Sequence, residues 1–342
     1  MKALVKYDKG PGNVALMEMP EPVCKPGQVK LEIAYCGICG TDLHVYHDTF
    51  KNFPPVILGH EFVGKVVEKS PEVSNIKIGE YYAVLGANAI TCGQCYHCQK
   101  GEFMFCPQRR GMGHGINGAF TRFAVARPDQ LYVLPSHLEI KQGALVEPLA
   151  AAVHAVIEVA KVQLGDTVLV SGPGPIGLLC AKLLLRQAIK VILSGTSLDR
   201  QRLSLAKDLG VHRTVMVDQE DLGAIIEDET CGRGVDLAFE TAGAQGSVAN
   251  CLAALRPLGQ LVQVGHFGQE LVLPWDHVAF KQLTIKGSVG YTKETWSQTM
   301  KILSQGFDAT DIVTHEFALD DWQLGFDLCE NKEAVKVLIR PE

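Results

Sequence analysis

The chain has 342 residues, of which 47% are apolar and 20% are charged, and its formal net charge is −6. This length predicts about two domains, and the composition is that of a globular protein rather than a disordered one. An acidic chain without a basic block is poorly suited to nucleic acid or to an anionic membrane surface, so we expect neither as a partner.

The N-terminal stretch MKALVKYDKG has no apolar run long enough for a signal peptide. The longest apolar stretch, ALVEPLAAAVHAVIEVA, is interrupted by Glu147, Pro148, His154 and Glu158, so we do not expect it to span a membrane. These features predict a cytoplasmic protein, in which disulfides are disfavoured. The 11 cysteines therefore need another explanation.

The region before Gly143 is rich in glycine and proline and contains short strand-like runs such as GQVKLEIAYCG and EFVGKVVEKS, which predict a β-rich domain. Within it, YCGICGTDLH and GHEFVG supply Cys39, His60 and Glu61. One thiolate, one imidazole and one carboxylate suit a zinc site that keeps a position open for water or substrate. Glu147 adds a carboxylate in apolar surroundings. Each of these residues alone has a commoner structural explanation, and their combination is what indicates a metal site.

Between these ligands lies TCGQCYHCQKGEFMFC, with the spacing C-x2-C-x2-C-x7-C at Cys92, Cys95, Cys98 and Cys106. Four thiolates fill a tetrahedral zinc and leave no position for substrate, which is typical of a structural site. The residues between the cysteines are small or polar, so metal binding would supply the folding energy of this loop. Free surface thiols and an iron–sulfur cluster are the alternatives.

The next segment predicts a dinucleotide-binding fold. A short β-branched run, TVLVS, leads into Gly172-Pro173-Gly174-Pro175-Ile176-Gly177, then an apolar helix IGLLCAKLLLRQ and a second strand KVILSG. A G-x-G-x-x-G sequence between strand and helix lets the backbone approach a pyrophosphate at the helix N-terminus. The later runs RTVMV, VDLAFETAG and GQLVQVGHFG continue a parallel, doubly wound sheet.

The segment after about Thr284 is too short for a domain and is expected to return to the first one. We therefore predict one domain from residues 1–146 and 285–342, with a zinc lobe at about 88–108. Residues 147–284 are expected to form the dinucleotide-binding domain.

Together these residues resemble the zinc-containing medium-chain alcohol dehydrogenase superfamily over nearly the whole chain. The markers are GICGTDLH, GHEFVG, the four-cysteine lobe, Glu147-Pro148, SGPGPIG and the final VKVLIRP. Polyol dehydrogenases of the sorbitol type look most similar, followed by threonine dehydrogenases. The resemblance implies an α/β protein with a Rossmann domain inserted in a β-rich GroES-like domain, and it implies zinc in the four-cysteine lobe.

The resemblance also implies residue roles. Cys39, His60 and Glu61 would hold a catalytic zinc, and Glu147 would be a fourth ligand or a neighbouring group that exchanges with water. Thr41 would contact the substrate oxygen, and His44 would relay the proton or contact the substrate. The residues expected to bind the cofactor are Gly172, Gly174, Pro175, Ile176, Gly177, Ser197, Arg202, Thr241, Val264 and Lys336.

The choice of cofactor depends on the end of the second strand, where NAD enzymes place an acid for the ribose. The simplest alignment puts Ser197 there, with Asp199 as a substitute acid and with Arg200 or Arg202 as receivers of a 2′-phosphate. We expect NAD, with NADP as the rival.

The substrate is predicted to be a secondary alcohol of a polyol or polyol derivative. Sorbitol-type relatives carry an arginine where Gly290 stands, so sorbitol itself is not favoured. Threonine is the alternative, with Lys293 or Arg122 as anchors for its carboxylate. A nucleotide-binding protein without turnover is the alternative of another class. We also expect a homodimer or homotetramer, assembled through the dinucleotide-binding domains. The segment GQLVQVGHFGQELVLP contains a strand that could pair across a two-fold axis.

Overall fold

The computed structural model describes residues 1–341, which divide into two compact units. Residues 1–150 and 291–341 form the first unit, and residues 151–290 form the second. The C-terminal segment thus returns to the unit in which the chain begins.

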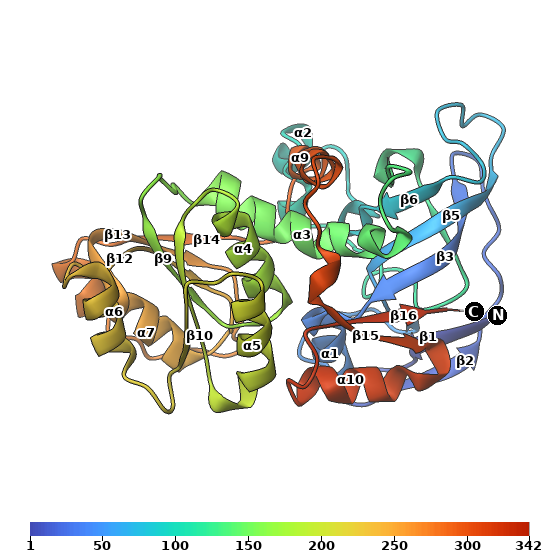
Figure 1. The fold of residues 1–342 in the computed structure, drawn as a ribbon. Coiled ribbons are helices and arrows are strands. Elements are labelled where there is room, and N and C mark those ends of the chain that lie inside the picture. The colour runs from blue at the N-terminus through green and yellow to red at the C-terminus, as the bar shows by residue number, and fades with distance from the viewer. Residues whose placement is uncertain (342) are drawn as a thin grey trace. The chain divides into compact units, whose positions relative to one another are not determined.

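The first unit is built on β-structure, with a three-stranded sheet ordered β2-β1-β4 and a larger sheet ordered β15-β16-β3-β5-β6-β8, in which β7 also pairs with β3 (Figure 1). The strands are β1 (Lys2–Lys6), β2 (Val14–Glu18), β3 (Val29–Gly37), β4 (Val56–Ile57), β5 (Glu61–Lys69), β6 (Tyr81–Val84), β7 (Phe123–Ala126), β8 (Leu131–Val133), β15 (Val313–Ala318) and β16 (Lys336–Arg340).

Register in the larger sheet matters for the site described below. Gly37 at the end of β3 pairs with Glu61 at the start of β5 and with Leu338 of β16. Three segments far apart in the sequence therefore meet in one row. In Figure 1 the red strand β16 lies beside the blue strand β3.

The helices of the first unit are mostly short. They are α1 (Gly40–Tyr46), α2 (Tyr96–Gln99), α3 (Val146–Val153), α9 (Lys293–Ser304) and α10 (Trp322–Glu330). The apolar core joins both parts of the unit, because Trp322, Phe326 and Val337 pack in the same cluster as Leu31, Phe62 and other strand residues of the N-terminal part.

The second unit is a six-stranded parallel sheet in the order β11-β10-β9-β12-β13-β14. Its strands are β9 (Thr167–Ser171), β10 (Lys190–Gly195), β11 (Arg213–Met216), β12 (Val235–Glu240), β13 (Leu255–Gln263) and β14 (Thr284–Gly287). Its helices are α4 (Pro175–Leu185), α5 (Arg200–Asp208), α6 (Leu222–Thr230), α7 (Gln245–Ala254) and α8 (Asp276–Phe280).

The central strand β9 is buried along its whole length, as expected for a parallel strand covered by helices on both faces. The strand order reverses beside β9, which is where doubly wound sheets bind their ligands. The predicted α/β class, with a Rossmann sheet and a β-rich unit, is confirmed.

One continuous helical stretch, Ile140–Val159, is 20 residues long and apolar enough to cross a membrane by length and composition, with a mean hydropathy of 1.2. However, 67% of its apolar window is buried inside the protein. It also carries Glu147, so it is interpreted as a core helix.

Candidate active site and metal centres

Cys39, His60 and Glu61 come together in the first unit, with their ligand atoms all within 4.8 Å of one another. Cys39 precedes α1, while His60 and Glu61 stand at the start of β5. A side chain at Gly37 would place its Cβ 2.3 Å from Glu61 Oε2, so the absence of a side chain on β3 makes room for that carboxylate. This donor set of one sulfur, one nitrogen and one oxygen fits zinc with an open position.

Asp42 orients His60, and the sequence analysis did not assign it a role. Its Oδ1 lies 3.5 Å from His60 Nδ1, and its Oδ2 accepts a 2.9 Å hydrogen bond from the Cys39 backbone N–H. The buried Nδ1 has no closer polar partner among the described residues. A carboxylate on one ring nitrogen leaves the other for a metal. In the sequence, the position of Asp42 three residues after the ligand Cys39 is the one feature that indicates this role.

The charges around this group show what a metal would do there. Burial opposes the charged form of His60, but Asp42 and Cys39 raise its pKa well above its usual range. Burial in turn raises the pKa of the Cys39 thiol. The group therefore favours a positive charge among its donors, which a divalent cation would supply while Cys39 ionises and His60 stays neutral.

Lys336 lies against Glu61 in the first unit. Its Nζ donates to Glu61 Oε2 at 2.7 Å, to Glu61 Oε1 at 3.0 Å and to the Ile38 carbonyl at 2.9 Å, and both side chains are 1% exposed. All its ammonium contacts in the described structure are internal to the first unit, and a contact of Lys336 with the cofactor stays a prediction. A carboxylate has about four lone-pair sites, so Glu61 keeps capacity for a metal.

Glu147 is held beside this group by a residue that the sequence analysis also missed. The Tyr291 hydroxyl donates to Glu147 Oε1 at 2.8 Å. Burial raises the pKa of Glu147 to about 7, and Glu61 adds to this effect while His60 and Tyr291 oppose it. Glu147 is not one of the three residues whose donors lie within 4.8 Å of one another. In the sequence, the one feature that indicates Tyr291 is its position next to Gly290, which was considered for substrate choice.

Thr41 and His44 lie on α1, directly after Cys39. Thr41 is partly buried, whereas His44 is exposed and its Nδ1 lies 3.0 Å from Thr49 Oγ1. An exposed imidazole one turn from a half-buried hydroxyl can pass a proton to solvent.

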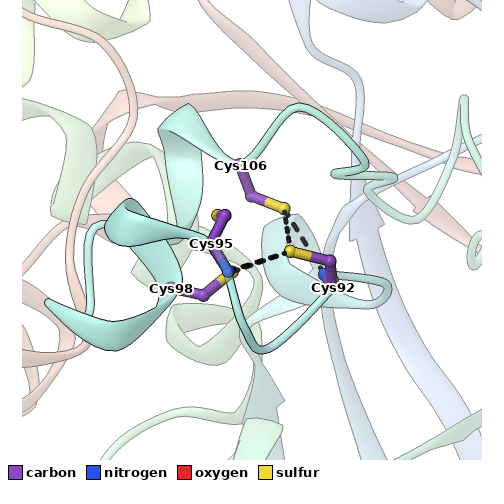
Figure 2. A group of neighbouring side chains, drawn as sticks. All are labelled: Cys92, Cys95, Cys98 and Cys106. Atoms are coloured by element: carbon purple, nitrogen blue, oxygen red, sulfur yellow. Dashed lines mark hydrogen bonds between the residues drawn. The ribbon is translucent and has the colours of Figure 1, made fainter.

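The four cysteines of the lobe form a second group, with all four sulfurs within 4.8 Å of one another (Figure 2). Cys92 Sγ lies 3.9 Å from Cys98 Sγ and 3.7 Å from Cys106 Sγ. A zinc tetrahedron with Zn–S bonds of about 2.3 Å has S–S edges of about 3.8 Å. None of the four is in a disulfide.

Backbone N–H groups favour the thiolate form of Cys92 in this lobe, and the thiolate is the form that binds metal. Those of Gln94 and Cys95 lower the pKa of Cys92 to about 6. Burial and the neighbouring sulfurs instead raise the pKa of Cys98 to about 11. These surroundings disfavour a second negative charge in the lobe when no metal is bound. A divalent cation would remove that opposition, and the sulfur spacing fits zinc.

The glycine-rich turn of the second unit runs from the end of β9 to the start of α4, where Gly174 is the N-cap. A Cβ at Gly177 would lie 1.9 Å from the Gly172 carbonyl oxygen, so only glycine permits this close packing of helix on strand. Thr241 Oγ1 donates to the carbonyls of Ser171 and Gly172 at 2.9 Å and positions the turn. The Val264 backbone N–H donates to the Glu240 carbonyl at 2.9 Å.

The residues expected near the ribose at the end of β10 have partners within the second unit. Asp199 is 4% exposed and accepts from the Thr196 N–H and hydroxyl, so it closes a turn instead of facing a ribose. Arg202 lies 3.5 Å from Asp199 with its side chain 11% exposed, so it is held by that carboxylate. Ser197 donates its N–H and its hydroxyl to Asp218.

Strand β10 ends at Gly195, two residues before Ser197, and a Cβ on Gly195 would lie 2.8 Å from Pro173 Cγ. In the turn that follows, Asp199 accepts hydrogen bonds from Thr196, and Asp218 accepts them from Ser197.

The two proposed anchors for a threonine carboxylate are also engaged. Lys293 Nζ lies 2.9 Å from Asp129 Oδ2, and Arg122 donates to Glu32 at 2.9 and 3.1 Å. Both cations already have carboxylate partners.

Comparison with known proteins agrees with this geometry over the whole chain. The family model for the alcohol dehydrogenase GroES-like domain matches residues 25–136, and that for the zinc-binding dehydrogenases matches residues 175–305. A sorbitol dehydrogenase of Halalkalibacterium halodurans is 34% identical, covering 100% of this chain and 99% of the relative. A D-arabitol-phosphate dehydrogenase of Enterococcus avium is 33% identical, covering 99% and 97%.

Solved structures are similar as well. The 2R,3R-butanediol dehydrogenase of Bacillus subtilis superposes with a TM-score of 0.88 at 31% identity, covering 100% of this chain and 99% of that one. Galactitol-1-phosphate dehydrogenase of Escherichia coli has a TM-score of 0.89 at 26% identity, with 100% of both chains covered.

The open three-donor group, the closed four-thiolate lobe and the glycine-rich turn are thus found in a chain that matches these dehydrogenases from end to end. The chain belongs to the zinc-containing medium-chain alcohol dehydrogenase superfamily and is a zinc- and nicotinamide-dependent oxidoreductase.

Proposed function

We propose that the enzyme oxidises a secondary alcohol of a polyol or polyol derivative to a ketone, with Cys39, His60 and Glu61 as ligands of a catalytic zinc. The observation that carries this proposal is the open donor group beside Glu147, separate from the closed four-thiolate lobe. A nucleotide-binding protein without turnover is disfavoured, because such a protein has no need of a complete open metal site.

The chemistry of the two cofactors is general. Zinc in such a site supplies Lewis acidity that lowers the pKa of an alcohol hydroxyl, and the nicotinamide supplies the hydride acceptor. The balance is one hydride from the carbinol carbon to the nicotinamide and one proton from the hydroxyl to solvent, which leaves a ketone.

The chain's own residues position the substrate and move the proton. Thr41 would hold the reacting oxygen, and His44 would carry the proton outward. The exposure of His44 supports this role. Glu147, kept in place by Tyr291, would orient water or substrate at the open position without being a permanent ligand, since turnover needs that position free.

Polyols are the favoured substrates because the relatives and solved neighbours named above act on sorbitol, arabitol phosphate, butanediol and galactitol 1-phosphate. An L-threonine 3-dehydrogenase of Photorhabdus laumondii is also 33% identical, covering 99% of each chain. The ion pairs of Lys293 and Arg122 weigh against threonine, because neither residue offers a carboxylate an unpaired cation.

NAD is the favoured dinucleotide, bound by the second unit as its dinucleotide-binding domain. The Asp218 carboxylate, which accepts hydrogen bonds from Ser197, supports this choice. Its negative charge at the turn disfavours the 2′-phosphate of NADP.

We also propose a homodimer or homotetramer in the cytoplasm. The strand β13, which lies in the segment expected to pair between subunits, is enclosed by β12 and β14, so that expectation is wrong. The end of the sheet order is β14, whose residues are largely exposed. Isologous pairing of two β14 edges would cover them.

The proposed function is tested by a cofactor-reduction screen. Polyols, polyol phosphates and threonine are each offered with NAD and with NADP, and we expect turnover of a polyol-type alcohol with NAD. Turnover of threonine alone would contradict the assignment.

A second prediction separates the two metal sites. Cys39→Ser should abolish turnover while the melting temperature and dinucleotide affinity stay close to wild type, because the lobe and the Rossmann unit are untouched. Cys98→Ser should lower the melting temperature, because it opens a closed structural site. Elemental analysis should give two zinc ions per wild-type chain and one in each variant.

The matched control for both is Cys24→Ser, at a partly buried thiol outside both groups. Near-normal turnover of Cys39→Ser would overturn the catalytic assignment.

A third prediction concerns Glu147. Glu147→Gln should keep most of the zinc and lose about 10-fold to 100-fold in turnover, the usual range for a residue that supports a metal site from outside. Zinc content and turnover are measured on one sample, with Glu32→Gln as control. Loss of metal in step with activity would make Glu147 an obligatory ligand instead.

A fourth prediction concerns assembly. Light scattering at micromolar concentration should give the mass of a dimer or tetramer, and Ile285→Lys on β14 should shift it toward the monomer. A monomeric wild-type protein would refute the assembly.

A further inference from the structure

A cavity of about 500 Å³ in the first unit has three cationic side chains and no acid in its wall. This volume is in the range of small-molecule sites, which run from about 300 to 1,000 Å³. The wall consists of Lys51, Phe53, Ile90, Pro107, Gln108, Arg109 and Arg110. We call this cavity the cationic pocket.

The three cations of the cationic pocket have no carboxylate partner in the described part of the chain. Lys51 Nζ lies 5.5 Å and Arg110 Cζ lies 4.1 Å from the centre of the Phe53 ring, and Arg109 Nη1 donates to the Ala87 carbonyl at 3.3 Å. Other cations of this unit, such as Arg122 and Lys293, do have acidic partners. Three like charges gathered around an empty volume are suited to an anion of high charge.

The backbone of this wall is fixed. Arg110 and Ile90 exchange two backbone hydrogen bonds of 3.0 Å, and the Arg109 N–H donates to the Cys106 carbonyl at 3.0 Å. Cys106 belongs to the four-thiolate lobe. The loop of the four-thiolate lobe therefore fixes the backbone from which both arginines extend. Guanidinium groups are able to make bidentate contacts with an oxyanion.

The cationic pocket lies close to the reacting end of the site. A Cβ on Gly111 would lie 2.8 Å from His114 Nε2 and 3.5 Å from Arg109 Nη1, so both groups flank this glycine. The His114 ring centre is in turn 6.5 Å from that of the metal ligand His60. One imidazole thus separates the arginine from the metal group.

Two electrostatic effects agree with this proximity. Burial, together with His60 and Arg109, lowers the pKa of His114 to about 3, so this histidine is neutral. Burial and Glu147 raise the pKa of Tyr291 well above its usual range, whereas Arg109 opposes that rise.

We propose that the substrate is a polyol esterified with phosphate at one end, and that Lys51, Arg109 and Arg110 bind this phosphate while the alcohol to be oxidised lies at the Cys39, His60 and Glu61 group. This inference rests on the proposed polyol dehydrogenase function and names its substrate class. The ester takes no part in the reaction and leaves with the ketone.

Other substrates fit the cationic pocket less well. A neutral polyol offers the three cations only hydroxyl acceptors and no negative charge. An amino acid would bring an ammonium group, for which the pocket wall has no acid. A phosphate dianion matches both the charge and the bidentate geometry of arginine.

The test compares ribitol, arabitol and galactitol with their terminal phosphate esters, using kcat/KM for each. The wild-type enzyme should prefer the esters. Lys51→Gln and Arg110→Gln should each lower kcat/KM for the esters by about 10-fold to 100-fold, as expected for the loss of a hydrogen bond to a charged group. The ratio of kcat/KM for the ester to kcat/KM for the free polyol should fall in the same variants. The conservative variant Arg110→Lys should keep part of this ratio.

Lys65→Gln is the matched control, because Lys65 is an exposed cation on β5 outside the cationic pocket. Binding of the same esters without cofactor, by calorimetry, gives a second readout that does not need turnover. Arg110→Gln should weaken binding, and inorganic phosphate should compete for the wild-type site.

The outcomes separate this inference from the proposed function. Oxidation of free polyols as efficiently as their esters, unchanged in Arg110→Gln, would overturn the phosphate site and leave the dehydrogenase function standing. Ester binding that Arg110→Gln abolishes, without oxidation of any alcohol, would support the site and refute the function. An equal loss in Lys65→Gln, or no ester binding at all, would also overturn the site.

Discussion

A buried ion pair between Glu61 and Lys336 links the metal group to the far end of the chain. Both side chains are 1% exposed, and the two residues are 275 positions apart. A buried carboxylate without its partner would cost about 3–5 kcal/mol. This constraint gives a physical reason why the C-terminal segment returns to the first unit, with β16 beside β3 and in the same row as β5.

The four-thiolate lobe has a second consequence besides local stability. Its loop has little apolar content, so metal coordination replaces a hydrophobic core there. Through Cys106 and the backbone of Arg109 and Arg110, that coordination also sets one wall of the cationic pocket. The structural metal lobe takes no part in the reaction, but it holds the backbone of Arg109 and Arg110, which we assign to substrate choice.

The second unit shows how a common fold is adapted by one turn. The glycine-rich segment requires glycine at position 177 for steric reasons, as in any close helix–strand packing of this kind. At the end of β10, however, Pro173 fills the space that a side chain on Gly195 would need, and the acids nearby bond to the turn itself. We therefore assign the choice of cofactor to Ser197 and Asp218, which bond to each other at this turn.

The sequence by itself determined the fold class, both sets of metal donors and the glycine-rich turn, because each depends on residue type at short spacing. Cys92 to Cys106 lie within one loop, and His60 and Glu61 are adjacent. It could not determine the partner of Lys336, the partners of Lys293 and Arg122, or the roles of Asp199 and Tyr291. Those depend on contacts between residues far apart in the chain or on the hydrogen bonds of one turn. Only the packed tertiary structure decides them, because a buried charge takes whichever partner folding brings within hydrogen-bond distance.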